Sequence, residues 1–240
     1  LHELKEIIKH HNVAGFIFEP LLQGAAGMIM YSPQILSEMI HLCKQNDIIT
    51  IADEVSTGFG RTGKYFAADH LSHKPDIICM SKGITGGVMA LGATSTTRQV
   101  YNVFLSDDKS KMFLHGHSYT GNPLACVVAK ASLDVLQQDD TWTAIKRISD
   151  QHHEFVETIS IHPQVEDARS LGVVLAVTVK SGSEESYFNY LRDKLYNFFI
   201  ERKILLRPLG NVIYMMPPYC ITDEELKMVY TAISDLLDEL

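Results

Sequence analysis

Two short apolar runs that end in charged side chains decide the fold: residues 48–54 read IITIADE, and residues 76–82 read DIICMSK. Their length and their Ile content predict buried β-strands over Ile48–Ala52 and Asp76–Met80. Asp53 and Lys82 follow the ends of these strands. In an open parallel sheet, ligands bind beyond the carboxyl ends of the strands. We therefore expect Asp53 and Lys82 to share one edge of the sheet.

Strand and helix signals alternate on both sides of these runs. Further strands are predicted over Val13–Phe18 and Leu91–Thr96, and the pair Ser32-Pro33 is typical of a helix start. Short apolar strands separated by helices or long connections indicate an α/β fold with a mostly parallel sheet. The helices that we expect after the last strand lie near Arg98–Phe104, Asn122–Leu136 and Trp142–Ile161.

The pattern changes after Ile161, where shorter strands predict a smaller α+β unit. Thr222, with Glu225 three residues later, has the spacing of a capping box and predicts a final helix to Leu240. We expect one domain over 1–161, the larger part with its linking helix, and a small C-terminal domain over 162–240. The other elements predicted in it are strands at Val165–Ala168, Val173–Val179, Ile204–Leu206 and Val212–Met215, and a helix at Glu184–Arg202.

Charge and cysteine content narrow the class of protein. The formal net charge is −8 and basic residues are scattered, so neither nucleic acid nor an anionic membrane is an expected partner. No apolar run approaches the ~20 residues of a membrane span. The four cysteines are far apart, which favours reduced thiols in the cytoplasm. Because the chain begins with Leu and soon enters an apolar strand, we expect it to lack an N-terminal portion.

Lys82 and Asp53 together suit pyridoxal phosphate (PLP). This cofactor needs a lysine amine to hold its aldehyde as a Schiff base, and a carboxylate at its pyridine nitrogen. A lone lysine is usually a solvated surface residue. Lys82 instead lies in a stretch from Ile77 to Thr97 that carries little charge, which favours the cofactor role.

Three other features could indicate a functional site, but the residues around each of them argue against it. Gly58–Lys64 fits both glycine-rich nucleotide motifs. A phosphate loop needs Ser or Thr after its lysine, where this chain has Tyr65, and the dinucleotide motif needs a strand that ends at its first glycine, whereas the strand here ends earlier. We expect a flexible active-site loop there. Gly116-His117-Ser118 begins like a nucleophile elbow but lacks its last glycine, and its polar side chains before a helix better suit a phosphate contact. The histidines show no metal-ligand spacing, so no metal is expected.

Arg207 lies between the short strands of the second unit, after Ile204-Leu205-Leu206. This setting predicts partial burial, and a partly buried arginine needs a carboxylate or phosphate. Arg207 is therefore a candidate for binding a substrate carboxylate, with surface salt bridging as the alternative.

The chain resembles the class III (omega) aminotransferases, PLP-dependent enzymes of fold type I. Order and spacing agree over the whole chain in four segments: Phe18–Gly24, Ile51–Gly63, Ser81–Gly83 and Gly121–Ala125. Within that class it is most similar to members that use S-adenosylmethionine to aminate 8-amino-7-oxononanoate in biotin biosynthesis. The segments that carry this narrower similarity are Thr85–Gly87, Met112–Gly116, Arg207–Gly210 and Ile213–Tyr219.

The resemblance implies a role for each matching residue. Lys82 matches the Schiff-base lysine and Asp53 the carboxylate at the pyridine nitrogen. His117 and Ser118 fall where the family usually has Pro-Thr, which contacts the PLP phosphate of the neighbouring subunit, so a cytoplasmic homodimer is implied. His117 departs from this pattern. The residues that match substrate contacts are Gly116, Arg207 and Tyr214.

Two alternatives stay open. The chain resembles other class III aminotransferases at Asp53 and Lys82, including those that use ornithine, a γ-amino acid or a diamine. A fragment of such an enzyme, lacking upstream residues that contact cofactor and substrate, would be inactive by itself. Lysine in place of S-adenosylmethionine as the donor is a further alternative.

Overall fold

The structure is a computed structural model that describes residues 1–180 and 191–240. Contacts divide the chain into two compact units. The first unit contains Leu1–Leu21, Tyr31–Phe59 and Lys64–Gln137, and the second contains Leu22–Met30, Gly60–Gly63 and Gln138–Leu240. The sequence predicted one boundary, at residue 161. The contacts instead group the linking helix with the second unit, which includes Gln138–Leu240. The boundary at residue 161 stays a prediction.

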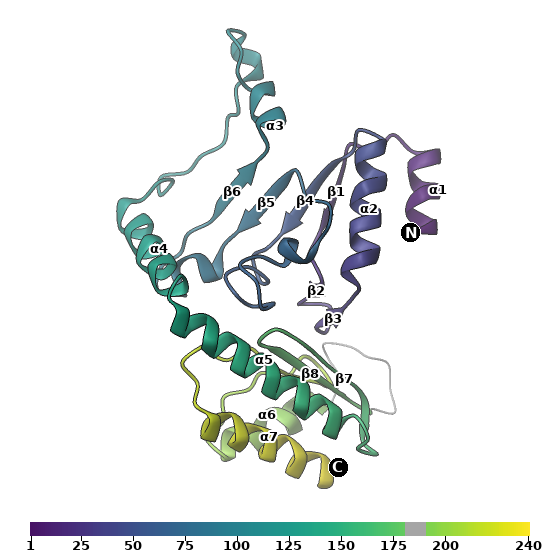
Figure 1. The fold of residues 1–240 in the computed structure, drawn as a ribbon, viewed down its shortest axis with the longest axis vertical. Coiled ribbons are helices and arrows are strands. Elements are labelled where there is room, and N and C mark those ends of the chain that lie inside the picture. The colour runs from purple at the N-terminus through teal and green to yellow at the C-terminus, as the bar shows by residue number, and fades with distance from the viewer. Residues whose placement is uncertain (181–190) are drawn as a thin grey trace. The chain divides into compact units, whose positions relative to one another are not determined.

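A four-stranded sheet forms the centre of the first unit, in the order β1-β4-β5-β6 (Figure 1). β1, β4 and β5 are parallel, and β6 runs antiparallel to β5. The mostly parallel α/β sheet predicted from the sequence is thus confirmed. The strands span Gly15–Phe18 (β1), Ile49–Asp53 (β4), Ile77–Met80 (β5) and Ala93–Thr96 (β6).

Helix α2 (Pro33–Gln45) begins as the sequence predicts. The Ser32 side chain accepts hydrogen bonds from the backbone amides of Gln34 and Ile35, and Pro33 occupies the first turn. The buried side of α2 includes Leu36, Ile40 and Cys43. Helix α1 (His2–His10) was not predicted, and its residues are all at least partly exposed. The remaining helices of this unit are η1 (Ala67–His70), η2 (Lys82–Thr85), α3 (Arg98–Val103), η3 (Lys109–Lys111) and α4 (Pro123–Leu136).

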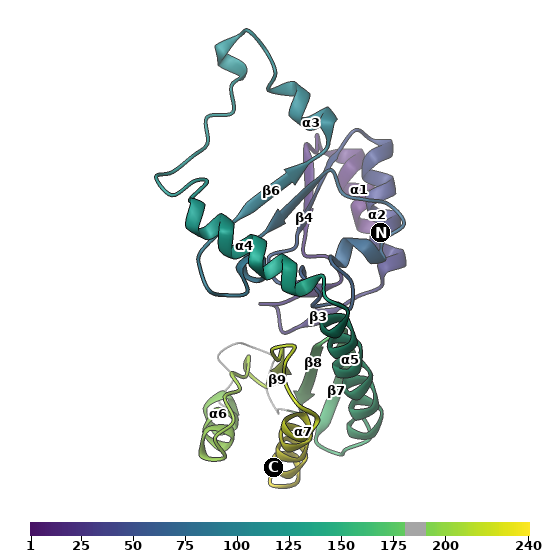
Figure 2. The same cartoon turned by 60° about the vertical axis from the view of Figure 1, so that its left-hand side comes forward.

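The segment from α3 to the start of α4 extends away from the sheet of the first unit, as Figures 1 and 2 both show. Every residue from 111 to 120 is exposed. Several of these residues are large and apolar: Phe113 is 64% exposed, Leu114 84% and Tyr119 75%. We call residues 111–120 the exposed arm.

An antiparallel sheet in the order β7-β8-β9 forms the centre of the second unit. β8 (Val174–Val179) is buried along its whole length, and all of its residues except Thr178 are apolar. β7 (Val165–Leu171) and β9 (Val212–Met215) confirm the other two predicted strands. The predicted strand Ile204–Leu206 is wrong, because this segment runs without strand pairing. A short hairpin of β2 (Leu22–Gln23) and β3 (Ile29–Met30) also belongs to this unit.

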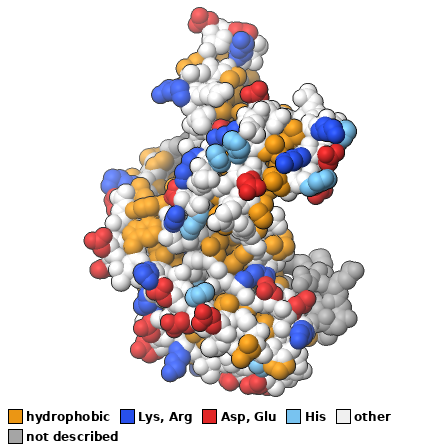
Figure 3. All heavy atoms as spheres, turned by 45° about the vertical axis from the view of Figure 1, so that its right-hand side comes forward, with side chains coloured by type: hydrophobic (Ala, Val, Ile, Leu, Met, Phe, Trp, Pro, Cys, Tyr) orange, Lys and Arg blue, Asp and Glu red, His pale blue; other side chains and the backbone are white. Residues whose placement is uncertain are grey.

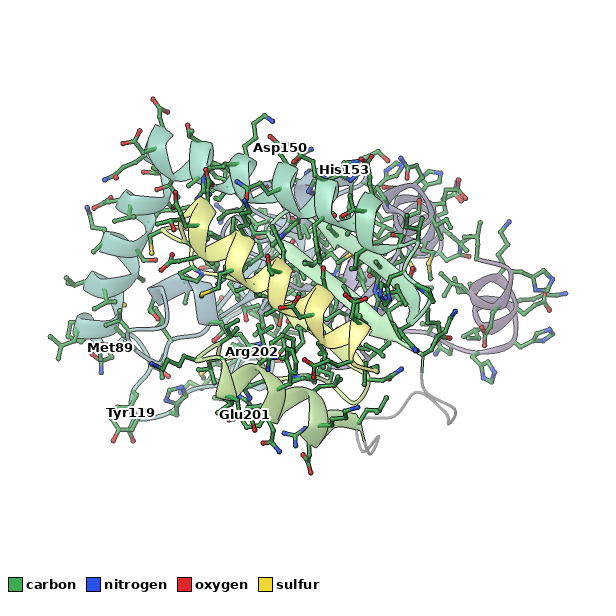
Figure 4. The ribbon with its side chains drawn as sticks, turned by 90° about the horizontal axis from the view of Figure 1, so that it is seen from below. Met89, Tyr119, Asp150, His153, Glu201 and Arg202 are labelled. Atoms are coloured by element: carbon green, nitrogen blue, oxygen red, sulfur yellow. The ribbon has the colours of Figure 1, made fainter. Side chains whose placement is uncertain are left out.

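The described residues of the second unit also form the helices α5 (Asp139–Ile159), α6 (Leu191–Glu201) and α7 (Asp223–Asp238). The capping box is confirmed: the Glu225 amide donates to the Thr222 hydroxyl, and the Thr222 amide donates to the Glu225 carboxylate. The first residues of the helix predicted from Glu184 fall in 181–190, outside the described residues. Figure 4 shows Asp150 and His153 on the outer side of α5.

The surface carries both signs of charge. Acidic and basic side chains are interspersed on the face that Figure 3 shows. Within residues 1–180 and 191–240, no helix is long and apolar enough to cross a bilayer.

Candidate active site

Asp53 is the last residue of β4, at the carboxyl edge of the sheet. It pairs in parallel register with Cys79 of β5, and the next amide, that of Glu54, donates to the Cys79 carbonyl at 2.9 Å. The half-buried Asp53 carboxylate is oriented by the Val55 amide, which donates to its Oδ1 at 3.0 Å. One carboxylate is therefore fixed where ligands bind in parallel sheets.

Lys82 follows β5 at the same edge, as its place in the sequence predicts. It is the first residue of η2, it is exposed, and its φ of +44° is unusual for a residue with a side chain. Its Nζ donates a hydrogen bond of 2.7 Å to the hydroxyl of Ser56, three residues beyond Asp53. The structure thus brings the loop after β4 and the lysine after β5 together.

Ser56 is a site residue that sequence reasoning missed. A serine in a polar loop carries no signal of its own, because such residues are common in turns. Because Ser56 is far from Lys82 along the chain, the sequence also did not indicate the contact between them. Only the strand register, which aligns Asp53 with Cys79, makes the pair expected.

Glu54 is fully buried beside Asp53. Its carboxylate accepts hydrogen bonds from the Thr57 hydroxyl and from the amides of Ala67 and Ala68, the latter two at 3.1 and 2.7 Å. Burial raises the pKa of this carboxyl, while the three hydrogen bonds act in the opposite direction. Glu54 therefore fastens the loop that carries Ser56 to the start of η1.

Gly83 allows a close contact next to the lysine. A Cβ atom there would lie 3.0 Å from the ring of Phe59, so a larger residue would displace one of the two. Phe59 in turn packs edge to face on Phe66, with ring centroids 5.5 Å apart. The backbone on the C-terminal side of Lys82 is therefore held by an aromatic pair.

Gly116, His117 and Ser118 lie in the exposed arm. The His117 amide donates to the Thr120 hydroxyl at 3.0 Å, and the Thr120 amide donates back to the His117 carbonyl at 3.0 Å. This tight turn precedes α4, whose N-cap is Asn122. Figure 4 shows Tyr119 of the same turn pointing away from the ribbon.

Arg207 and Tyr214 belong to the second unit. The prediction that Arg207 is partly buried is wrong: the residue is exposed. The reason is that residues 204–208 form no strand; Ile204 and Pro208 are buried, while the residues between them include Leu205, which is 74% exposed. Arg207 and the half-buried Tyr214 line a cavity of about 570 Å³, whose other lining residues include Leu206, Met216 and Val229.

The glycine-rich loop is anchored at Arg61, and its expected role as a flexible active-site loop stays a prediction. Within the second unit, the Val173 amide donates to the Arg61 carbonyl at 3.0 Å. The Arg61 guanidinium donates to the Pro217 carbonyl at 2.8 Å and lies over the ring of Tyr219. Neither glycine-motif spacing nor composition signals these contacts, because they join segments far apart in sequence.

Arg169 was also missed. Its guanidinium donates to the carbonyl oxygens of Met28 and Gly27, at 2.8 and 2.6 Å, and to the Thr178 hydroxyl at 2.9 Å. It thereby holds the loop between β2 and β3 against β7 and β8. Arg169 lies between Ala168 and Ser170, just past the strand predicted over Val165–Ala168, and this polar setting carried no signal of its contacts.

The residues of the first unit fit PLP. An oriented carboxylate (Asp53) and an exposed amine (Lys82) stand at the ends of neighbouring strands, as the cofactor's ring nitrogen and aldehyde require. Among the residues with described positions, no three His, Cys, Asp or Glu side chains gather as a metal site would need.

Comparison with known proteins gives the family. The profile described as aminotransferase class-III matches residues 1–237. An adenosylmethionine-8-amino-7-oxononanoate aminotransferase from Synechococcus elongatus is 43% identical, covering 95% of this chain and 53% of its own length. The enzyme of that name from Helicobacter pylori is 40% identical over all of this chain and 56% of its own length. The chain thus spans about half the length of the curated relatives it matches.

Solved structures agree. The crystal structure of adenosylmethionine-8-amino-7-oxononanoate aminotransferase from Methanocaldococcus jannaschii has a TM-score of 0.90 at 35% identity, over 98% of this chain and 56% of that one. A PLP-bound amine transaminase from an uncultivated Pseudomonas species has a TM-score of 0.91 at 28% identity, over 99% and 55%. The expected fold, type I of the PLP-dependent transferases, is confirmed for the part present. Since the family profile extends over nearly every residue and the relatives are this similar, the chain belongs to the class-III aminotransferases.

Proposed function

We propose that the protein carrying this chain is a PLP-dependent aminotransferase that uses S-adenosylmethionine to convert 8-amino-7-oxononanoate to 7,8-diaminononanoate in biotin biosynthesis. The observation that carries the proposal is the pairing of β4 with β5, which sets the Asp53 carboxylate and the Lys82 amine at one edge of the sheet. The narrower assignment is supported by the shared name of the relatives at 34–43% identity.

Lys82 is the proposed covalent anchor and proton carrier. PLP, when bound, supplies an aldehyde carbon that takes up the amino group and a ring that draws electrons from the neighbouring carbon. Asp53 holds the proton on the ring nitrogen, because a carboxylate favours the charged partner beside it. Lys82, once its amine is free, would accept and donate a proton at its Nζ as the general base and acid of the transfer.

Arg207 and Tyr214 of the second unit are proposed to bind the acceptor, and Gly116 is proposed as a substrate contact because it matches one in the family that the chain resembles. A guanidinium recognises a carboxylate with two parallel hydrogen bonds. The apolar wall beside Arg207, with Leu206, Met216 and Val229, suits the aliphatic chain of an acceptor that ends in a carboxylate.

We further propose that the complete protein is a cytoplasmic homodimer in which His117 and Ser118 serve the partner's PLP phosphate. The exposed arm supports this proposal: it presents Phe113, Leu114 and Tyr119 to solvent, and adjoining apolar exposure of this kind marks interaction surfaces. The dimer is tested by sedimentation, with Leu114→Asp expected to shift the protein toward monomer.

The cofactor is tested by absorbance after addition of PLP. We expect a band near the visible edge in the unaltered protein and in Lys64→Ala, and no such band in Lys82→Ala. Lys64 is a matched control because it lies in the same unit and donates to the Asp69 carbonyl, away from Asp53 and Ser56. A band that persists in Lys82→Ala would contradict the assignment of the anchor, and its absence from the unaltered chain would favour an inactive fragment.

The runner-up is another class-III activity, and the likeness to the amine transaminase at TM-score 0.91 favours it. Donor profiling distinguishes the two. Amino transfer to 8-amino-7-oxononanoate from S-adenosylmethionine or from lysine would support the first proposal and identify the donor. Transfer only from ornithine, a γ-amino acid or a diamine would support the second.

A further inference from the structure

The amine of Lys82 is hydrogen-bonded to a side chain that lies in the segment Ile51–Gly63 but to which the family resemblance assigns no role. Its Nζ donates to the Ser56 hydroxyl at 2.7 Å. The amine is otherwise carried by an exposed residue, and a long exposed side chain populates many rotamers. The contact with Ser56 therefore selects one position for the reactive nitrogen.

Ser56 is well placed to do so, because both of its neighbours are fixed. On one side, the Val55 amide donates to Asp53 Oδ1 at 3.0 Å. On the other, the Thr57 hydroxyl donates to the buried carboxylate of Glu54. The Gly58 amide closes the turn by donating to the Glu54 carbonyl at 3.0 Å. The Ser56 hydroxyl is thus presented by a turn that begins at Asp53, the residue proposed to contact the ring nitrogen of the cofactor.

The other end of Lys82 is fixed as well. The following residue, Gly83, packs against the Phe59 ring, where a Cβ atom would lie only 3.0 Å from the ring. Lys82 is therefore held at its backbone by the contact at Gly83 and, as far as the described residues show, at its nitrogen by Ser56.

We propose that Ser56 is a positioning residue that holds the Lys82 amine at the carboxyl edge of the sheet, ready for the aldehyde of an incoming cofactor. In that reaction the neutral amine forms a C=N bond with the aldehyde carbon, and the aldehyde oxygen leaves as water with both amine hydrogens. Orientation of the nitrogen raises the rate of this step because less freedom is lost on reaching it. The inference rests on the proposed function and names a determinant within it.

The experiment compares two aldehydes on the full chain. PLP must enter in one orientation, and its capture by Lys82 is followed by absorbance. Formaldehyde with a borane reductant attacks from any direction, and methylation of Lys82 in the absence of PLP is followed by peptide mass spectrometry. The variants are Ser56→Ala, Ser56→Thr, which keeps the hydroxyl, and Ser81→Ala, which removes a neighbouring hydroxyl that does not touch the amine.

We expect Ser56→Ala to slow PLP capture about three- to tenfold, the range for one lost hydrogen bond. Methylation by formaldehyde should stay within about twofold, and both Ser56→Thr and Ser81→Ala should capture PLP at close to the original rate. Equal PLP rates in Ser56→Ala and the unaltered chain would overturn the inference while leaving the proposed function standing. So would a parallel fall in both reactions, or an equal effect of Ser81→Ala. If the unaltered chain forms no Lys82-dependent band, this inference is overturned for the chain by itself, and that result favours the inactive-fragment alternative rather than deciding against the function proposed for the complete protein.

Discussion

The carboxylate of Glu54 and the backbone amide of Ala68 are joined by a hydrogen bond of 2.7 Å in the interior of the first unit. Replacing Glu54 with Ala leaves the amides of Ala67 and Ala68 without this acceptor and opens a cavity. Buried unsatisfied donors cost about 1–3 kcal/mol each, so we expect Glu54→Ala to destabilise the unit by about 3 kcal/mol or more. Thermal unfolding measures this loss, with exposed Glu38→Ala as the control.

Glu54→Gln tests the charge separately. Burial raises the pKa of Glu54 above its ordinary 4.5 in the folded state, so the folded protein holds this proton more tightly than the unfolded chain. Stability contributed by protonation is present below pH 4.5 and is lost as pH rises through the raised pKa. We expect this part of the pH dependence to vanish in Glu54→Gln. If the stability of that variant changes with pH above 4.5 just as that of the unaltered protein does, the raised pKa of Glu54 is contradicted.

The pH dependence of stability that His152 contributes has the opposite sign to that of Glu54. It is fully buried, its Nδ1 lies 2.6 Å from the Tyr230 hydroxyl, and burial lowers its pKa from 6.5 to about 4. The unfolded chain takes up the proton first, so stability falls as pH drops from about 6.5 to about 4, by about 3 kcal/mol at most. We expect His152→Gln to be less stable at pH 7 but to lose less on acidification, measured by urea unfolding across that range.

His153 is the matched control for that experiment. It adjoins His152 on α5, yet its side chain is 72% exposed and lies on the outer side of the helix (Figure 4). His153→Gln should leave the acid profile unchanged. If both variants flatten the profile equally, burial of His152 is not its cause.

Elements with strong local signals were predicted well from the sequence. The Ile-rich runs gave β4 and β5 within a residue of their ends, and Ser32 and Thr222 gave the starts of α2 and α7, because strand burial and helix capping are both local effects. The parallel register of β4 and β5 then places Asp53 and Lys82 at one edge of the sheet. This part of the candidate site follows from periodicity and the rules of parallel sheets alone.

Features that depend on distant contacts were not predictable. The apolar run Ile204–Leu206 has strand composition but finds no partner strand, so Arg207 is exposed rather than partly buried. The Ser56 contact with Lys82 and the Arg169 contacts with the β2–β3 loop need the tertiary fold. Composition reports a tendency to be buried, whereas burial itself is decided by what packs on the segment.

Gly172, at the turn between β7 and β8, allows the closest backbone approach in the second unit that we describe. Its φ is +57°, and a Cβ atom would lie 2.4 Å from the backbone carbon of Thr62. Gly172→Ala should therefore displace the Arg61–Gly63 loop and cost about 2–4 kcal/mol, more than the ~1 kcal/mol for a strained φ alone. Trp142 in α5 of the same unit, the chain's one tryptophan, reports the unfolding by fluorescence.

Gly27→Ala separates the clash from the conformational strain. Gly27 also has a positive φ, +102°, but a Cβ atom there would meet nothing nearer than a Val212 methyl at 3.8 Å. We expect its cost to be about 1 kcal/mol, the penalty of the backbone conformation alone. Equal losses in the two variants would mean that the contact with Thr62 is readily relieved.

Arg207 is tested through the acceptor that it is proposed to bind. Arg207→Lys keeps the charge but loses the two parallel hydrogen bonds of the guanidinium. Charged hydrogen bonds are worth about 1.5–3 kcal/mol, and exposure of Arg207 favours the lower end, so we expect KM for the acceptor to rise about tenfold. The PLP band and the rate of the first half-reaction with the donor should not change.

The control variant and a second acceptor decide what Arg207 recognises. Arg202→Lys alters another exposed arginine of the same unit, which donates to Glu239 and lies over Phe198, and it should leave KM unchanged. With an acceptor whose carboxylate is replaced by a methyl ester, the unaltered protein and Arg207→Lys should have nearly equal KM, because the ester cannot form the charged pair that the substitution weakens. If Arg207→Lys raises KM equally for both acceptors, Arg207 supports the shape of the cavity wall, and the carboxylate is bound by another residue.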